Sequence, residues 1–563
     1  MLIRLPLALL AAFLLARYVP TARAAGARFA RWLESPRWAP LAVALLTAVM
    51  LTAAWGSWHA IPVVHDEASY LFQAKLFASG HWTAPSPPFP QFFEQFHVFV
   101  VPRYASKYPP GHALLMVPGI WLGLPGLMPV LIAAAAAALV FSVVRRLTNG
   151  SIALLTWLLW ITAPYELWVF GSYFSQSTSL LTWMLGWYAL LRWREGGERW
   201  LLLVAGCVAW LAFTRPLTAV AYALPVGTYV LWRVSRTRQL ASLGRAMALG
   251  AAMLLVIPLW SRETIGTERE TPYALYSRMY FPWDAPGFGL DSTPPQRALP
   301  ADMQLITLVN RESHLEYVPA ALPRVLWKRA ARVAKDVWGA PRTILALFAI
   351  IGLGAMSAEI GFGLATLGVL LLAYLWFNHA ANWSIYYAEG HPVLMLITAL
   401  GLWRVLQWCV PREERAEATR GDAPARAPRP MAAAMVLVVA IFMADVARHM
   451  VANAHEASEM RESYQLAFQQ AIAKIPDPKS IVFVRYAPDH NPHLSLIYNE
   501  PDLAEARHWI VYDRGGENAR LLQLAPGRVG YLFDEPRHEL RPWVAARDSV
   551  LPMVADPEKT AAR

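Results

Sequence analysis

Apolar stretches long enough to cross a lipid bilayer recur along this chain, with short polar turns between them. A membrane span needs roughly 20 mostly apolar residues. Backbone polar groups in lipid must pair within the segment, so these stretches are expected to be helices. The pattern predicts an all-α polytopic membrane protein with about eleven spans, at residues 39–58, 127–144, 151–169, 176–191, 200–213, 217–232, 246–260, 343–357, 361–377, 392–408 and 431–447. A further apolar helix, 112–123, is too short to cross and is predicted to lie at the outer interface.

Basic residues collect at alternate ends of the predicted spans. Arg145 and Arg146 follow one span, Arg192 and Arg194 follow another, and Arg233 begins a third cluster. Such clusters mark the cytoplasmic side of a membrane protein. The long polar loops 59–111 and 261–342 are therefore predicted to lie outside.

The two ends of the chain differ from the membrane region, 39–447. Residues 1–38 are apolar and then basic, and the first 25 resemble a signal peptide that is cleaved, interfacial or an extra helix. The Pro- and Ala-rich segment 411–430 predicts a cytoplasmic linker. Residues 448–563 carry one helical stretch and the short apolar runs SIVFVRY, HWIVYD and RVGYLF, which predict buried strands of a small extracytoplasmic α/β domain.

Composition narrows the classes of function. Hydrophobic residues make up 56% of the chain, and the formal net charge is +11. We attribute the basic excess to topology and to anionic lipid, because no nucleic-acid-reading motif accompanies it. The two cysteines, Cys207 and Cys409, supply neither a disulfide framework nor a cysteine metal site.

The first outer loop carries the candidate chemistry. Its segment HDEASYLFQAKLFASG predicts a short helix. Asp66 is predicted to cap this helix, Glu67 to interact favourably with its positive N-terminal end, and Gly80 to terminate it. Ala68, Phe72 and Leu76 share a face that is expected to rest on the bilayer surface. On these grounds alone, helix capping explains Asp66 as well as catalysis does.

The position and company of the two acids favour a reaction. They follow a span directly, where a reactive group carried by a lipid would arrive. Arg103 and Lys107 lie in the same loop, and Lys107 opens the stretch KYPPG, which its two prolines stiffen. Cations near a carboxylate suit a reaction in which a phosphate leaves and a hydroxyl attacks.

These features resemble the C-type (GT-C) glycosyltransferases, in particular the protein O-mannosyltransferase and lipid A aminoarabinose transferase group. The resemblance rests on HDEASYLFQAKLFASG and SKYPPG in this order, on TRPLTA at 214–219, and on TPYALY and PWDAPGFG within 271–289. It implies a donor sugar linked to a polyprenyl phosphate, with membrane lipid as a partner and an acceptor that the sequence does not identify. Asp66, with Glu67 beside it, would be the general base of an inverting transfer. Lys107, Arg103 and Arg215 would hold the donor phosphate, and the implied substrate contacts are His65, Tyr70, Tyr108, Tyr386, Tyr387 and Glu389.

The chain also departs from that group. The stretch GSYFSQSTS has no acid where several relatives have a second one, although Glu166 precedes it, and NWSIYYAEGHP has no arginine. His379, Glu389 and His391 match no metal motif, so we assign no metal ligands and leave a divalent metal requirement open. Asp284 is interpreted as a turn residue.

The sequence thus predicts a glycosyltransferase of a bacterial-type cytoplasmic membrane, with its active site facing outside. Two alternatives remain. A transporter or flippase would place ionisable groups at mid-membrane, whereas these lie in an outer loop. A non-catalytic scaffold or sensor would be consistent with the missing second acid.

Overall fold

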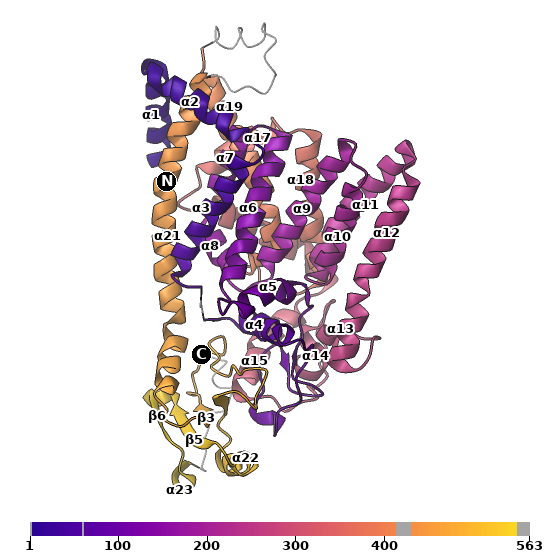
Figure 1. The fold of residues 1–563 in the computed structure, drawn as a ribbon, viewed down its shortest axis with the longest axis vertical. Coiled ribbons are helices and arrows are strands. Elements are labelled where there is room, and N and C mark those ends of the chain that lie inside the picture. The colour runs from indigo at the N-terminus through magenta and orange to yellow at the C-terminus, as the bar shows by residue number, and fades with distance from the viewer. Residues whose placement is uncertain (1–2, 59–60, 412–429, 549–563) are drawn as a thin grey trace.

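The computed structural model describes residues 3–58, 61–411 and 430–548. A bundle of helices forms one part of the molecule, and a small sheet lies beyond one end of it (Figure 1). One long helix, α21 (Pro430–Ala473), runs beside the bundle and continues to the sheet. The loops that carry the candidate chemistry lie between the bundle and the sheet.

All eleven predicted spans are helical. The helices concerned are α3 (Trp38–Trp55), α6 (Leu127–Leu147), α7 (Gly150–Ile161), α8 (Pro164–Gly171), α9 (Gln176–Arg194), α10 (Trp200–Ala212), α11 (Pro216–Thr237), α12 (Leu240–Leu254), α13 (Val256–Ile265), α17 (Leu345–Leu353), α18 (Ala358–Ala373) with η4 (Tyr374–Trp376), α19 (His391–Trp408) and α21. Within the described residues, six helices are long and apolar enough to cross a membrane, or up to eight if each bent pair is one span.

The length and composition of the helices therefore do not reproduce the predicted count of eleven spans. Helix α17 has 9 residues and α10 has 13, which is short for a complete crossing. The predicted span 151–169 is broken between α7 and α8, which meet at 81°. Pro164 begins α8, and proline at a first helical position is compatible with this restart.

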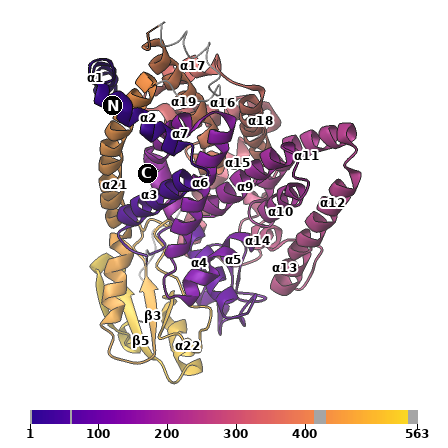
Figure 2. The same ribbon diagram turned by 45° about the horizontal axis from the view of Figure 1, so that its top comes forward.

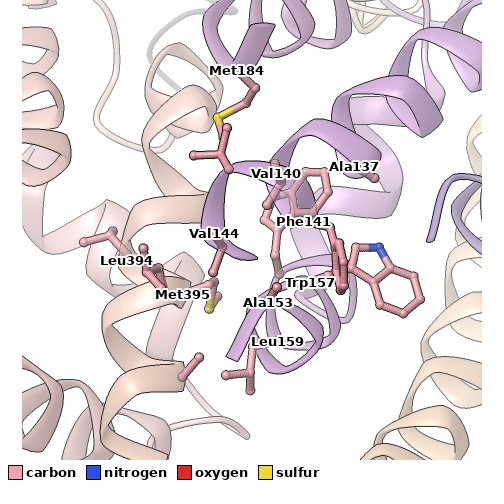
Figure 3. Close-up of a cluster of buried hydrophobic side chains, with 14 of the residues drawn as sticks. Ala137, Val140, Phe141, Val144, Ala153, Trp157, Leu159, Met184, Leu394 and Met395 are labelled. Atoms are coloured by element: carbon pink, nitrogen blue, oxygen red, sulfur yellow. The ribbon is translucent and has the colours of Figure 1, made fainter. Parts of the chain in front are cut away.

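Apolar side chains from four helices form the centre of the bundle. In Figure 3, Val140 and Phe141 of α6 lie near Trp157 of α7, with Met184 of α9 and Met395 of α19 around them. Small residues allow closer crossings elsewhere. A Cβ on Gly401 would come within 1.7 Å of the Phe348 carbonyl oxygen, so α17 and α19 cross almost backbone to backbone.

The N-terminal segment forms two helices, α1 (Arg4–Tyr18) and α2 (Pro20–Leu33), which meet at 107°. Both pack on α21. The continuous α21 unites the predicted last span with the predicted helix after it, so the expected domain boundary at 447 falls inside one helix. Most of the predicted linker 411–430 lies outside the described residues.

The predicted C-terminal strands are present as a four-stranded sheet. Strands β3 (Ser480–Arg485), β4 (His508–Tyr512) and β5 (Val529–Asp534) are parallel neighbours in the order β4-β3-β5, and β6 (Glu539–Pro542) pairs antiparallel with β5. Val482 lies opposite both Ile510 and Tyr531. Helix α22 (Asn518–Leu524), the short helix α23 (Ala545–Asp548) and the turns η6 (Gly515–Glu517) and η7 (Glu535–Arg537) complete this part.

The segments predicted to lie outside contain short helices and one hairpin. They hold α4 (His65–Ala78), η1 (Pro90–Phe92), β1 (Val98–Phe99), β2 (Ala105–Ser106), α5 (Gly111–Trp121), α14 (Pro272–Tyr280), η2 (Pro282–Asp284), α15 (Ala301–Leu315), η3 (Pro319–Ala321), α16 (Leu322–Trp338) and η5 (Ser384–Gly390). Turned by 45°, the molecule shows α4 and α5 near the sheet (Figure 2).

The apolar face of α4 does not rest on the bilayer as predicted. Phe72 and Leu76 are buried in one cluster with Phe483 and Trp509 of the C-terminal sheet. An amphipathic helix can bury its apolar face in a bilayer or against protein, and the face of α4 is covered by other parts of this chain. The C-terminal sheet and the helix that carries the acidic pair therefore share one apolar cluster, in which Phe92 and Phe93 contact the sheet residues Phe483 and Trp509.

Candidate active site

The first turn of α4 separates the two acids into different roles. Glu67 is fully buried, and its Oε2 accepts hydrogen bonds from the backbone amides of Val63 at 3.2 Å and Val64 at 3.0 Å. The capping role predicted for Asp66 is thus filled by Glu67, because α4 begins at His65, two residues before the start that a cap at Asp66 predicts. Oε2 of Glu67 is thus engaged by backbone, and a catalytic role for Glu67 stays a prediction. Gly80 follows the helix with a φ of +81°, as expected for its end.

Asp66 presents its carboxylate to the space below the bundle. Its side chain is 36% exposed. Oδ1 accepts a 2.5 Å hydrogen bond from the Tyr108 hydroxyl, and Oδ2 lies 3.7 Å from Nε2 of His97. Tyr70, one turn along α4, stacks on the Tyr108 ring at 4.5 Å. The carboxylate is therefore oriented on one oxygen and accessible at the other.

The β1–β2 hairpin brings Lys107 beside His97. Val98 pairs with Ser106, and the Lys107 amide donates to the His97 carbonyl at 3.0 Å. The Lys107 side chain is 2% exposed, and its Nζ lies 4.4 to 5.3 Å from the ring centres of Tyr108, Tyr273 and Tyr276. Aromatic faces stabilise a cation without neutralising it. Burial lowers the pKa of Lys107, against the opposing fields of Asp284 and Asp66.

A second outer loop supplies the other wall of this cluster. Thr271 caps α14 by accepting from the Ala274 amide at 3.3 Å, which sets Tyr273 in the first turn. The following turn η2 ends at Asp284, whose side chain is 24% exposed and whose carboxylate acts electrostatically on Lys107. Asp284 is thus a turn residue, as interpreted from the sequence, and also a second acid near the cation. Its place in PWDAPGFG was the available signal.

Arg215 lies deeper and already has an acidic partner. Its Nε is 3.6 Å from Oε1 of Glu389, and its Nη2 donates to the Tyr374 hydroxyl at 2.9 Å. Both charged side chains are buried, and Ser179 also bonds Glu389. The Ser175 hydroxyl accepts from Tyr70 at 3.1 Å and from Arg215 at 3.4 Å. Arg215 is therefore linked to Tyr70 through the Ser175 hydroxyl. Its contact with a phosphate remains a prediction.

The two predicted tyrosines of η5 separate. The Tyr386 ring lies 5.4 Å from the Arg215 guanidinium, on the side of the cluster. Tyr387 is fully buried, and its hydroxyl is hydrogen-bonded to Nε2 of His379 at 2.9 Å. Tyr387 packs away from Asp66 in the described structure, so it is better placed to support the fold than to touch a substrate.

His65 and Arg103 take different positions again. His65 is buried and stacks on Phe96 at 4.0 Å, and burial lowers its pKa to about 3. The His493 ring lies 5.9 Å from it, so a C-terminal loop that the sequence did not implicate reaches the site. Arg103 is exposed in the turn between β1 and β2, without a contact to Asp66 among the described residues.

The candidate metal ligands do not gather. His391 bonds Glu166 at 2.6 Å, His379 bonds Tyr387, and Glu389 pairs with Arg215. Across the ranges that the structure describes, no group of three or more His, Cys, Asp or Glu residues is arranged to hold a metal ion. The site is thus a carboxylate, a caged ammonium and a wall of tyrosines, which together can accept a proton and bind an anion.

Comparisons with known proteins give likenesses in fold. No family model matches the chain, and no curated protein matches its sequence. Among solved structures, it is similar to ArnT from Cupriavidus metallidurans bound to undecaprenyl phosphate, with 14% identity and a TM-score of 0.47 over 91% of this chain and 96% of that one. It is also similar to the oligosaccharyltransferase AglB from Archaeoglobus fulgidus in complex with an inhibitory peptide and a dolichol-phosphate, with 11% identity and a TM-score of 0.36 over 88% and 69%. ArnT is a lipid A aminoarabinose transferase, and both proteins belong to the GT-C superfamily that the motifs of this sequence resemble.

Proposed function

We propose that this protein is a membrane glycosyltransferase that moves a sugar from a polyprenyl-phosphate donor to a hydroxyl of an acceptor. The observation that carries the proposal is that an oriented, accessible Asp66 and a buried Lys107 both lie against Tyr108, in one cluster of tyrosines. Asp66 would act as general base, Lys107 as the cation for the leaving phosphate, and Tyr108 as the positioning residue between them.

The transfer balances with these groups alone. The acceptor oxygen forms a bond to the anomeric carbon while Oδ2 of Asp66 takes the hydroxyl proton. The bond between the anomeric carbon and the phosphate oxygen breaks, and its electron pair leaves with the polyprenyl phosphate. Attack opposite the leaving group inverts the anomeric centre, through an oxocarbenium-like state as in glycoside hydrolysis.

Lys107 is suited to the leaving phosphate by its lack of a close anion. No carboxylate of the described residues lies within 4.0 Å of its Nζ, whereas Arg215 is paired with Glu389. A developing negative charge is stabilised most by a fixed cation in a site shielded from water. Asp284 would keep Lys107 charged in the absence of donor, because its carboxylate favours the ammonium form.

Charge distribution supports an active site on the non-cytoplasmic side. Ion pairs connect the basic turns with one another. Arg146 lies 2.7 Å from Glu195, and Arg194 lies 3.0 Å from Glu359. By the positive-inside rule, the turns that carry these arginines are cytoplasmic. Helix α4 follows α3 at the end remote from the basic turn that precedes α7 (Figure 1). The donor would therefore be used on the outer surface of a cytoplasmic membrane.

The proposal is tested by transfer with full-length protein in nanodiscs. Undecaprenyl- and dolichyl-phosphate sugars are supplied as donors, with membrane lipid, glycan and peptide fractions as acceptors, and products are identified by mass spectrometry. We expect product from at least one donor and a loss of roughly 100-fold or more for Asp66→Asn, the usual scale for a general base. Asp291→Asn is the matched control, because Asp291 lies in an exposed loop and bonds only Thr293 among the described residues.

Parental rates in a stably folded Asp66→Asn variant would remove Asp66 from the mechanism. Donor binding by the parent without any product would favour the scaffold or sensor alternative. Movement of intact donor across a sealed membrane without transfer would favour a flippase.

A further inference from the structure

A cavity of about 640 Å³ lies beside the outer half of α21, where the end of α3 and the bend between α7 and α8 face that helix. Its walls are mostly apolar and include Trp55, Trp168 and Phe442. None of the residues around Asp66 and Lys107 lines it. The wall formed by α21 extends from Phe442 to Arg461, about 28 Å at about 1.5 Å per residue. The cavity is therefore an elongated apolar space on helices that are apolar enough to meet lipid.

Arg342 brings a poorly compensated charge to this cavity. Its side chain is 4% exposed, and Nη2 donates to the Leu159 carbonyl at 2.5 Å. Its Nε and Nη1 have no hydrogen-bond partner among the described residues. Glu166 is the acid that acts on it electrostatically, but Glu166 is bonded to His391 at 2.6 Å. A buried cation is costly unless an anion accompanies it.

Arg461 provides a second guanidinium on the facing wall. It lies 4.8 Å from the ring centre of Trp168, and both residues line the cavity. Its charge also acts on Glu67, the residue that caps α4. The cavity thus combines apolar walls with three arginines from different elements, Arg4, Arg342 and Arg461, the composition that matches an amphiphile with an anionic head.

We propose that this cavity binds an anionic glycerophospholipid from the surrounding bilayer. Its phosphate lies between Arg342 and Arg461, and its acyl chains follow α21 and α3. Guanidinium groups bind phosphate through paired hydrogen bonds, for which Arg342 has two nitrogens free of protein partners. The donor carrier is the poorer occupant, because the cation proposed for its phosphate, Lys107, belongs to a separate cluster.

The lipid would add a further contact between elements that already pack on one another. Arg461 connects the cavity to Glu67, and Glu67 holds the first turn of the helix that presents Asp66. A bound headgroup would therefore steady α21 against the base of α4. This inference goes beyond the proposed transfer and does not depend on it, since it concerns binding of a lipid at another place.

The test measures lipid binding by full-length protein. Delipidated protein is placed in phosphatidylcholine nanodiscs with increasing phosphatidylglycerol, and the bound lipid is identified and quantified by native mass spectrometry. We expect one retained phosphatidylglycerol in the parent and at least tenfold weaker retention when Arg342→Gln and Arg461→Gln are combined. Ala457→Trp, which fills the cavity without changing charge, should exclude the lipid.

Arg448→Gln is the matched control. Arg448 lies on α21, is exposed, pairs with Asp445 at 3.2 Å and does not line the cavity, so its loss should leave retention unchanged. Arg461→Gln and Ala457→Trp carry the test singly if Arg342→Gln does not fold. Equal retention in the parent and the cavity variants would overturn the proposal. Displacement of phosphatidylglycerol by equimolar undecaprenyl phosphate would overturn the choice of lipid. Neither result depends on whether sugar transfer is observed.

Discussion

The Tyr108 hydroxyl donates a 2.5 Å hydrogen bond to Oδ1 of Asp66. In sequence, the two residues flank the β1–β2 hairpin. Asp66 lies in the first turn of α4, and Tyr108 follows β2. Stacking of Tyr108 on Tyr70 fixes the ring that carries this hydroxyl. The bond therefore sets the direction of the carboxylate and leaves its second oxygen for an incoming hydroxyl.

Replacing Tyr108 with Phe should slow transfer without preventing donor binding. The change removes a hydrogen bond to a charged group, worth about 1.5–3 kcal/mol, so kcat should fall roughly 10- to 100-fold. The KM for donor should change little, because the ring beside Lys107 remains. Initial rates at several donor concentrations separate the two effects.

Tyr104→Phe is a close control for that variant. Tyr104 is fully buried in the same loop, and its hydroxyl has no hydrogen-bond partner among the described residues. Its removal should leave kcat near the parental value. Equal losses in both variants would mean that Tyr108 acts through packing rather than through Asp66.

Binding of the carrier phosphate should weaken at alkaline pH. Burial lowers the pKa of Lys107, so the ammonium loses its proton below the ordinary range of lysine. The phosphate binds the charged form, and its affinity is therefore full below the lowered pKa and falls as pH rises through it. Inhibition by undecaprenyl phosphate, measured between about pH 7 and about pH 10, follows this change.

The Lys107→Arg variant provides the comparison, since a guanidinium stays charged over that range. Its inhibition profile should be flat if the side chain fits among the three tyrosine rings. A profile for the parent that is equally flat would contradict the role of Lys107 in holding the phosphate.

The sequence predicted the features that repeat or that follow local rules. Helical periodicity located helices in every predicted span, although six to eight rather than eleven are long and apolar enough to cross a membrane among the described residues, and the β-rich runs located β3, β4 and β5. It could not predict contacts made between distant segments. Asp284 approaches Lys107 only through the folding of the second long loop, and His493 approaches His65 only because the C-terminal part of the chain folds against the first long loop.

The exchange of roles between Asp66 and Glu67 has a local cause. Aspartate is a preferred capping residue, so the sequence favoured Asp66 for that position. Helix α4 instead begins at His65, which places Glu67 at the third position, where its longer side chain reaches back to two amides. A shift of two residues in the helix start thus decides which carboxylate faces the site.

Loss of the Glu67 carboxylate should reduce stability more than it reduces chemistry. Glu67→Gln retains the size of the side chain but weakens the bonds to Val63 and Val64 and the interaction with Arg461. We expect a loss of about 1–2 kcal/mol, the scale of a helix cap. Thermal unfolding in detergent measures this loss, and kcat per folded molecule should stay within about threefold of the parent. A stable variant without activity would return Glu67 to the catalytic group.

Docking of the C-terminal sheet on α15 should depend on the protonation of Asp302. The buried Asp302 accepts a hydrogen bond from the Tyr512 hydroxyl at 2.9 Å, which joins α15 to β4. Burial raises the pKa of Asp302 to about 6, although the hydrogen bond from Tyr512 acts in the opposite direction and lowers it. Because the folded value exceeds the unfolded one, the stabilisation is complete below about pH 4 and is lost as pH rises through about 6, by at most about 3 kcal/mol.

Hydrogen exchange of β4 and α15 at about pH 4.5 and about pH 7.5, corrected for intrinsic rates, measures this docking. The parent should be better protected at the lower pH. Asp302→Asn keeps a neutral side chain at both values and should remove the difference, whereas Asp291→Asn in the exposed loop should retain it. An undiminished difference in Asp302→Asn would assign the pH dependence to a group other than Asp302.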